Sequence, residues 1–204
     1  MLSDAPQTVY LKDYRPPQFL VEQVDLDFDL GDDATLVQAR LSMRRNPDRE
    51  DGDGVLELMG ERLELLSLLL DGAPLATDAY RLSVSGLQIP GVPDRFVLET
   101  RVRIRPQDNT ELEGLYRSGG MFCTQCEAEG FRRITYFPDR PDVMARFSTS
   151  IRADRARYPV LLSNGNRLEH EELDDGRHRV RWQDPFPKPS YLFALVAGDL
   201  RCIE

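Results

Sequence analysis

Apolar and polar residues alternate with a period of two along most of the chain, a pattern typical of half-buried β-strands. The clearest case is residues 24–30, where four apolar residues alternate with three aspartates. A turn containing Gly31 follows, and residues 37–44 alternate again, with two arginines among the polar positions. The two runs predict a long β-hairpin in which an acidic strand pairs with a basic one.

The same pattern predicts further strands, separated by turn residues such as Asp71-Gly72 and Asn164-Gly165. These strands cover residues 55–58, 63–70, 80–84, 96–104, 147–153, 160–163 and 178–183. A Gly/Asp turn is expected at residues 51–54. Residues 191–197 are almost entirely apolar, so we expect a strand that is buried on both faces.

Helical periodicity is weak, and the best candidate is a short helix over residues 141–146, with Asp139 near its start. The sequence has no internal repeat. We therefore predict an all-β fold of two packed, mainly antiparallel sheets. The expected organisation is a tail at residues 1–13, a single β-domain at residues 14–198, and an exit segment at residues 199–204.

Residues 109–141 break the alternating pattern and contain many glycine and polar residues. A segment this long in a compact domain is usually a functional loop or is disordered. Five aromatic residues argue against disorder: Tyr116, Phe122, Phe131, Tyr136 and Phe137. We therefore predict one long functional loop here.

Composition excludes several classes of partner. The 204 residues carry a formal net charge of −9, which disfavours nucleic acid binding. Arg101, Arg103 and Arg105 form a basic stripe, interpreted as the solvated face of a strand rather than a phosphate-binding edge.

No window approaches the roughly 18 apolar residues of a membrane span, and the amino terminus lacks the pattern of a secretory signal. Three cysteines, an odd number, favour a reducing cytoplasm.

Cys123-Thr124-Gln125-Cys126 is a lone C-x-x-C motif. A structural zinc site needs four ligands, and the only remaining Cys and His candidates, at positions 170, 178 and 202, are far apart in the sequence. A redox pair is expected where a strand meets a helix, whereas this motif runs into acidic residues. The favoured interpretation is a pair of packed cysteines.

No complete catalytic constellation is present. The run from His170 to Asp174 resembles H-E-x-x-H, but Asp174 stands where the second histidine is required. With two histidines in the chain, no Ser/His/Asp grouping forms. Glu127 and Glu129 could act as paired carboxylates, but their spacing alone does not show whether they face one another.

Three blocks in this part of the chain carry a specific resemblance: residues 112–119 (LEGLYRSG), 123–132 (CTQCEAEGFR) and 135–143 (TYFPDRPDV). Later blocks agree with them in order and spacing, namely 162–166 (LSNGN), 182–189 (WQDPFPKP) and 191–199 (YLFALVAGD). From about Tyr14 onward, the chain resembles the amino-terminal β-domain of the bacterial aminopeptidase N family of zinc aminopeptidases.

The resemblance implies a saddle-like domain that covers the active site of a thermolysin-like catalytic domain. In the family, that catalytic domain holds the H-E-x-x-H zinc helix, a more distant glutamate ligand and a G-x-M-E-N motif, none of which occurs here. Catalytic residues and zinc are therefore expected outside this chain, with no metal ligand within it. Residues 199–204 are expected to begin the link to the catalytic domain, and the fragment alone is expected to be inactive.

Gln125 and Glu127 match the family segment that reaches the free amino group of the substrate, so they are expected to bind peptide amino termini. The domain is also expected to form one wall of the S1 pocket. Glu129 is expected to pair with Arg132 or Arg133, while Tyr136 and Phe137 are expected to be loop core. Two other functions stay open: a stand-alone β-sandwich interaction module without a protease partner, and a domain from the epoxide-hydrolase branch of the superfamily.

Overall fold

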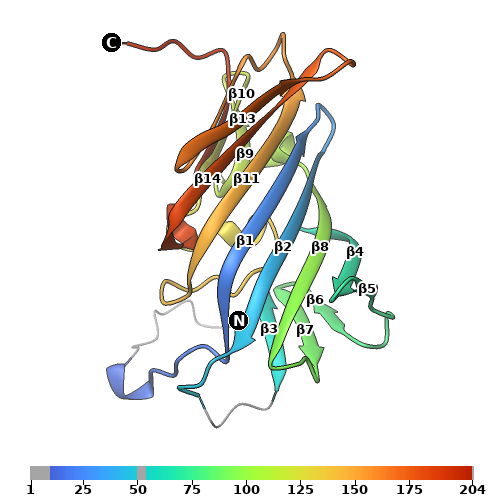
Figure 1. The fold of residues 1–204 in the computed structure, drawn as a ribbon, viewed down its shortest axis with the longest axis vertical. Helices are drawn as coiled ribbons and strands as arrows, with labels where there is room; N and C mark the ends of the chain where they lie inside the picture. The colour runs from blue at the N-terminus through green and yellow to red at the C-terminus, as the bar shows by residue number, and fades with distance from the viewer. Residues whose placement is uncertain (1–9, 50–53, 204) are drawn as a thin grey trace, which may run out of the picture.

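Eight strands form one long sheet in the computed structural model, which describes residues 10–49 and 54–203 (Figure 1). Their order across the sheet is β13-β14-β11-β1-β2-β8-β4-β5. Neighbouring strands are antiparallel, apart from the parallel pair β1 and β11. Their bounds are β1 Phe19–Leu30, β2 Thr35–Arg45, β4 Glu64–Leu70, β5 Ala73–Pro74, β8 Arg95–Ile104, β11 Met144–Asp154, β13 Asn166–Glu172 and β14 Arg177–Pro189.

The hairpin predicted for the first two strands is confirmed as β1 and β2. Their apolar positions are fully or almost fully buried, as in Phe28 and Leu41, because alternate side chains point to one face of the sheet. On the other face Asp25 lies opposite Arg40, and their charged groups are 3.5 Å apart. The predicted pairing of acidic and basic strands is therefore present.

The predicted all-β, mainly antiparallel fold is confirmed. Two smaller sheets accompany the large one, so residues 10–49 and 54–203 form one sheet more than the two predicted. One has the order β12-β15-β10-β9 and the other β3-β7-β6. Their bounds are β3 Val55–Met59, β6 Arg81–Ser83, β7 Gly86–Pro90, β9 Gly114–Ser118, β10 Met121–Gln125, β12 Val160–Ser163 and β15 Leu195–Gly198. The extra sheet forms because β3 pairs with β7, whose Gly86 allows close approach to Leu58, while β4 pairs with β8.

Two local predictions were wrong. Residues 141–143 form a turn rather than the start of a helix, and β11 already begins at Met144, one residue before buried Ala145. The apolar run at 191–197 is not a strand buried on both faces. It begins within the 3₁₀ turn η4 Ser190–Leu192, and Leu192 is 51% exposed. The outward-facing positions of this run are apolar as well, so the sequence pattern does not distinguish them from buried positions.

Strand β13 was not predicted as a strand. All seven of its residues are exposed, so it has no apolar alternation to reveal it. It is held at the edge of the large sheet by pairing with β14. A turn at Asp174 to Gly176 joins β13 to β14.

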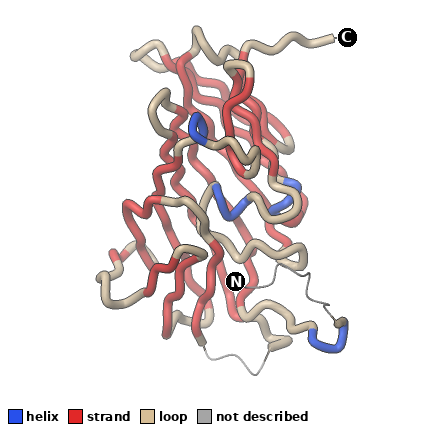
Figure 2. The backbone as a smooth tube through the Cα atoms, turned by 180° about the vertical axis from the view of Figure 1, so that it is seen from behind, coloured by secondary structure: helices blue, strands red, loops and turns tan. Residues whose placement is uncertain are grey.

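A cluster of phenylalanine rings joins the large sheet to the segment 109–141. Phe131 lies within the 3₁₀ turn η3 Phe131–Arg133 and packs edge-on against Phe137, Phe147 and Phe193, with centroid distances of 5.0, 5.9 and 5.3 Å. Phe193 also stacks on Phe28 of β1. Short helical turns and their connecting loops lie across this side of the large sheet (Figure 2). The segment 109–141 is therefore anchored to the core.

Residues 1–9 of the expected tail, Glu204, and residues 51–53 of the expected Gly/Asp turn lie outside the described residues. The remaining part of the tail includes a short exposed turn, η1 Leu11–Asp13. Within the described part of the chain, no helix is long and apolar enough to cross a membrane.

Candidate functional site

The segment expected to be one long loop is built on a β-hairpin. Strands β9 and β10 pair from Gly114 opposite Gln125 to Ser118 opposite Met121, through a turn with positive φ at Gly119 and Gly120. β10 also pairs with β15 on its other side. The predicted loop therefore contains two paired strands before its turns, and the argument against disorder is confirmed. The strands were missed because their exposed and buried positions do not differ clearly in polarity.

A tight turn at residues 125–130 follows β10 and leads into η3. The Gly130 amide donates a hydrogen bond to the Cys126 carbonyl at 2.9 Å. A Cβ atom at Gly130 would lie 2.4 Å from the Gln125 carbonyl oxygen and 2.9 Å from the Gly114 amide nitrogen. Only glycine fits this contact without a shift of backbone, so Gly130 closes the turn against the start of β9.

Gln125 and Glu127 come together at the exposed side of this turn. The Gln125 side-chain amide donates a hydrogen bond to the main-chain carbonyl of Glu127, with the two atoms 3.2 Å apart. The Gln125 side-chain oxygen has no hydrogen-bond donor among the described residues and is open as an acceptor. Both residues are exposed, and across residues 10–49 and 54–203 the Glu127 carboxylate has no hydrogen-bond or ion-pair partner. The turn thus presents one unpaired carboxylate beside one amide oxygen.

The two cysteines of the C-x-x-C motif differ in burial. Cys126 is 2% exposed, and burial, together with the nearby negative charge of Asp139, raises the pKa of its thiol. Burial also raises the pKa of Cys123. Both thiols are therefore protonated at neutral pH, whereas redox chemistry and metal ligation require the thiolate. These features agree with the interpretation as packed cysteines.

Glu129, the second carboxylate of the turn, pairs with Arg132, at 3.2 Å between Oε2 and Nη1. The expected pairing is therefore confirmed for Arg132. Tyr136 and Phe137 are 4% and 0% exposed, which confirms their placement in the core.

Sequence reasoning missed the buried carboxylate of Asp139, expecting it only near a helix start. Its Oδ2 accepts hydrogen bonds from the Arg132 main-chain amide and from Arg132 Nε, both at 3.1 Å. Its Oδ1 accepts a hydrogen bond from the Ser190 hydroxyl at 2.5 Å. Its place next to Tyr136 and Phe137, from which only Pro138 separates it, was the signal that could have marked it, since a carboxylate buried among aromatic residues needs such partners.

The residues that the structure describes do not fit a zinc ion. Within the described ranges, no three His, Cys, Asp or Glu side chains are grouped to hold a metal ion. The two histidines lie on neighbouring strands, but His170 Nε2 and His178 Nδ1 hydrogen-bond to each other at 3.2 Å. His178 Nε2 donates in turn to the Tyr158 carbonyl at 2.8 Å. The ring nitrogens that converge are therefore already occupied.

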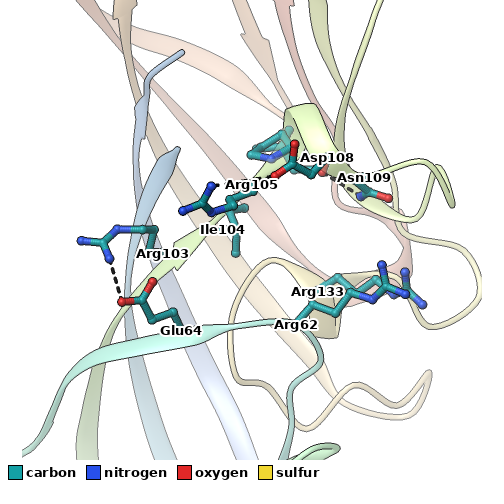
Figure 3. Close-up of a pocket in the computed structure, with 10 residues that line it drawn as sticks. Arg62, Glu64, Arg103, Ile104, Arg105, Asp108, Asn109 and Arg133 are labelled. Atoms are coloured by element: carbon teal, nitrogen blue, oxygen red, sulfur yellow. Dashed lines mark hydrogen bonds and ion pairs between the residues drawn. The ribbon is translucent and has the colours of Figure 1, made fainter. Parts of the chain in front are cut away.

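A separate cavity of about 230 Å³ lies between β4, β8 and η2 Pro106–Asp108 (Figure 3). Arginine side chains surround it, but each has acidic partners. Arg103 bonds to Glu64 at 2.7 Å, and Arg62 and Arg133 extend together away from that pair, both meeting Glu111. Because these charges are neutralised locally, the cavity offers no concentrated positive charge to an anion.

The comparisons with known proteins agree with one another. A model described as "Peptidase M1 N-terminal domain" matches residues 91–192. The chain is 56% identical over 200 residues to aminopeptidase N of Caulobacter vibrioides, covering 98% of this chain and 23% of that protein.

Solved structures show the same fold. The chain is 41% identical to Legionella pneumophila aminopeptidase A, crystallised in complex with aspartic acid, with a TM-score of 0.89 over 94% of this chain and 22% of that one. It also matches an M1 zinc metallopeptidase from Deinococcus radiodurans at 14% identity, with a TM-score of 0.76 over 91% of this chain and 43% of that one. The latter likeness concerns the fold alone. The chain thus spans less than a quarter of its more similar relatives.

Proposed function

The chain belongs to the family of peptidase M1 amino-terminal domains, and on this premise we propose that it recognises the free amino group of peptide substrates for a zinc aminopeptidase. In this proposal the whole protein removes single residues from peptide amino termini. The zinc ion and the reacting groups belong to a catalytic domain outside this chain. The amino-terminal domain supplies Gln125 and Glu127 as the amine anchor and forms one wall of the S1 pocket.

The unpaired Glu127 carboxylate beside the open Gln125 oxygen is the observation that carries this proposal. An α-amino group has a pKa near ~8, so it is mostly a cation at neutral pH. A carboxylate about 4 Å from this cation gains on the order of 4 kcal/mol at an effective dielectric constant of ~20, before desolvation costs. An internal peptide bond has no such charge, so this anchor selects the chain end.

The geometry of the turn supports different roles for the two residues in binding the amine. Because the Gln125 amide is already donating to Glu127, its side-chain oxygen is oriented as an acceptor for an ammonium hydrogen. Glu127 supplies the charge, and Gln125 supplies a directed hydrogen bond. We further propose a cytoplasmic setting, which the three free cysteines support.

The proposal is tested by assaying the purified 204-residue chain and the full-length protein of the same reading frame. With zinc present, the full-length protein is expected to hydrolyse an alanine anilide, and the 204-residue chain is expected not to. Turnover by the chain alone would refute the assignment of catalysis to another domain. A reading frame without a following metallopeptidase domain would favour the stand-alone interaction module instead.

A further inference from the structure

We infer that Asp139 is a positioning residue, which acts through Arg132 to hold the turn 125–130 in the geometry that binds the substrate amine. This inference rests on the proposed function of Gln125 and Glu127. Asp139 itself touches no substrate in this account, because its side chain is 1% exposed. Its effect is on where the neighbouring turn lies.

Asp139 fixes Arg132 at three points. Its carboxylate accepts from the main-chain amide and from Nε of Arg132, and its carbonyl accepts from Nη2 at 3.2 Å. Charge-assisted hydrogen bonds from a guanidinium in two places specify orientation as well as attraction. The Arg132 side chain is 14% exposed, so water competes little for these bonds.

Arg132, held in this orientation, contacts the turn 125–130. Its remaining nitrogen, Nη1, lies 3.2 Å from the Glu129 carboxylate, and Glu129 is two residues after Glu127. The Arg132 carbonyl also accepts a hydrogen bond from the Glu61 amide at 3.0 Å. The downstream end of the turn is therefore tied to two neighbouring segments.

The opposite end of the turn is already fixed by β-sheet pairing at Gln125. Both ends are held, and Gly130 packs against the Gln125 carbonyl, so the backbone between them is restricted in its movement. The Glu127 carboxylate has no hydrogen-bond or ion-pair partner among the described residues to hold it. Its position therefore depends on the backbone, and the backbone depends on the Asp139–Arg132 pair.

Ser190 connects the Asp139–Arg132 pair to the core of the domain rather than to its surface. Its hydroxyl donates to Asp139 at 2.5 Å, and it begins η4, which leads through Phe193 into β15. β15 pairs with β10, the strand that enters the turn. The same network thus connects the two sides of the turn through the interior.

The test uses the full-length protein and steady-state hydrolysis of an alanine anilide. Asp139→Asn keeps the size of the side chain but removes the charge that orients Arg132. We expect KM to rise about tenfold or more and kcat to change less than about threefold, since small misplacement of a binding group has large effects. Loss of folded protein alone would lower active-site concentration and leave KM unchanged.

Asp142→Asn is the matched control. Asp142, three residues after Asp139, forms an ion pair with Arg140, and among the described residues neither side chain of this pair has a hydrogen bond or ion pair to the turn 125–130. KM of this variant is expected to stay within about twofold of the parent value. An equal rise in both variants would overturn the inference.

Coupling to Glu127 separates this inference from the proposed function. If Asp139 acts through Glu127, the effect of Asp139→Asn on KM shrinks in a Glu127→Gln background. Independent, multiplying effects would overturn the positioning role alone. If Glu127→Gln leaves KM unchanged, the proposed function fails, and the inference fails with it.

A milder variant keeps the inference testable if Asp139→Asn does not fold. Ser190→Ala removes only one hydrogen bond to the Asp139 carboxylate. We expect KM to rise about threefold, in the same direction as for the stronger variant. A KM unchanged from that of the parent protein would count against the positioning role.

Discussion

The side-chain amide of Gln125 donates a hydrogen bond to the main-chain carbonyl of Glu127 across a distance of 3.2 Å. This contact places an unpaired carboxylate and an amide oxygen at the same exposed turn. The β9–β10 hairpin holds one end of the turn, and the buried Arg132–Asp139 pair holds the other. The candidate site is therefore an exposed turn whose position is fixed by residues packed beneath it.

The close approach of Gly130 to its neighbours predicts a steric cost for any larger residue. Its Cβ would overlap the Gln125 carbonyl, so Gly130→Ala is expected to lower the free energy of unfolding by about 1–3 kcal/mol. Gly119→Ala is the control, because the space there is open and only its positive φ is penalised, by roughly 1 kcal/mol. Urea unfolding of both variants measures the difference. Equal stability of the two would show that the turn can relax around a methyl group.

The phenylalanine cluster predicts a large core effect. Phe131 is 0% exposed and contacts three other rings, so Phe131→Ala is expected to cost about 3–5 kcal/mol of stability. Phe186 is 74% exposed, and Phe186→Ala is expected to change stability by less than about 0.5 kcal/mol. Thermal or urea unfolding followed by circular dichroism compares the two. A small effect at Phe131 would mean that η3 is not anchored by this cluster.

The buried histidine predicts a specific dependence of stability on pH. Burial lowers the pKa of His178 below its ordinary value near 6.5, and the nearby His170 and Arg155 add to this effect, while the hydrogen bond that the ring donates to the Tyr158 carbonyl opposes it. The unfolded chain therefore binds a proton that the folded chain resists. The contribution of neutral His178 to the free energy of unfolding is fully present above about pH 6.5 and is lost as pH falls below that value. The free energy of unfolding then changes by at most ~1.4 kcal/mol per pH unit.

This dependence is measured by urea unfolding between pH 5.5 and 7.5, a range in which ordinary carboxyl groups do not titrate. The parent chain is expected to lose stability toward pH 5.5, and His178→Gln is expected to lose less. His170→Gln is the control, since it leaves the buried ring in place. The same slope in parent and His178→Gln would assign the pH dependence to other groups.

The burial of the cysteines predicts their order of reaction with a thiol reagent. Cys202 is exposed and is expected to be labelled first, Cys123 more slowly, and Cys126 only after unfolding. Peptide mapping after a timed reaction with iodoacetamide gives the order. Early labelling of Cys126 in the folded chain would show that the turn opens in solution.

Period-two alternation in the sequence was enough to predict the β1–β2 hairpin and most central strands, because one face of the large sheet is apolar and the other charged. It failed where that contrast disappears. β13 is polar on both faces, and the segment before β15 is apolar even at exposed Leu192. The third sheet depends on which strands pair at long range, which local patterns do not encode.

For the candidate site, the residues Gln125 and Glu127 were found through family resemblance, since an exposed glutamate carries no distinguishing local pattern. The structure adds their hydrogen bond and the unpaired state of the carboxylate. Asp139 was not predicted as a site residue because its partners, Arg132 and Ser190, are 7 and 51 positions away. Only the folded chain brings these groups together.

The central claim is that Glu127 anchors the substrate amine, and its most direct test is kcat/KM of Glu127→Ala in the full-length protein. Loss of a charge partner for the ammonium group is expected to lower kcat/KM for an alanine anilide by about 2–4 kcal/mol in transition-state free energy. Glu169→Ala, which removes an exposed carboxylate from edge strand β13, is expected to leave kcat/KM unchanged. A Glu127→Ala protein as active as the parent would remove Glu127 from the amine anchor and contradict the account.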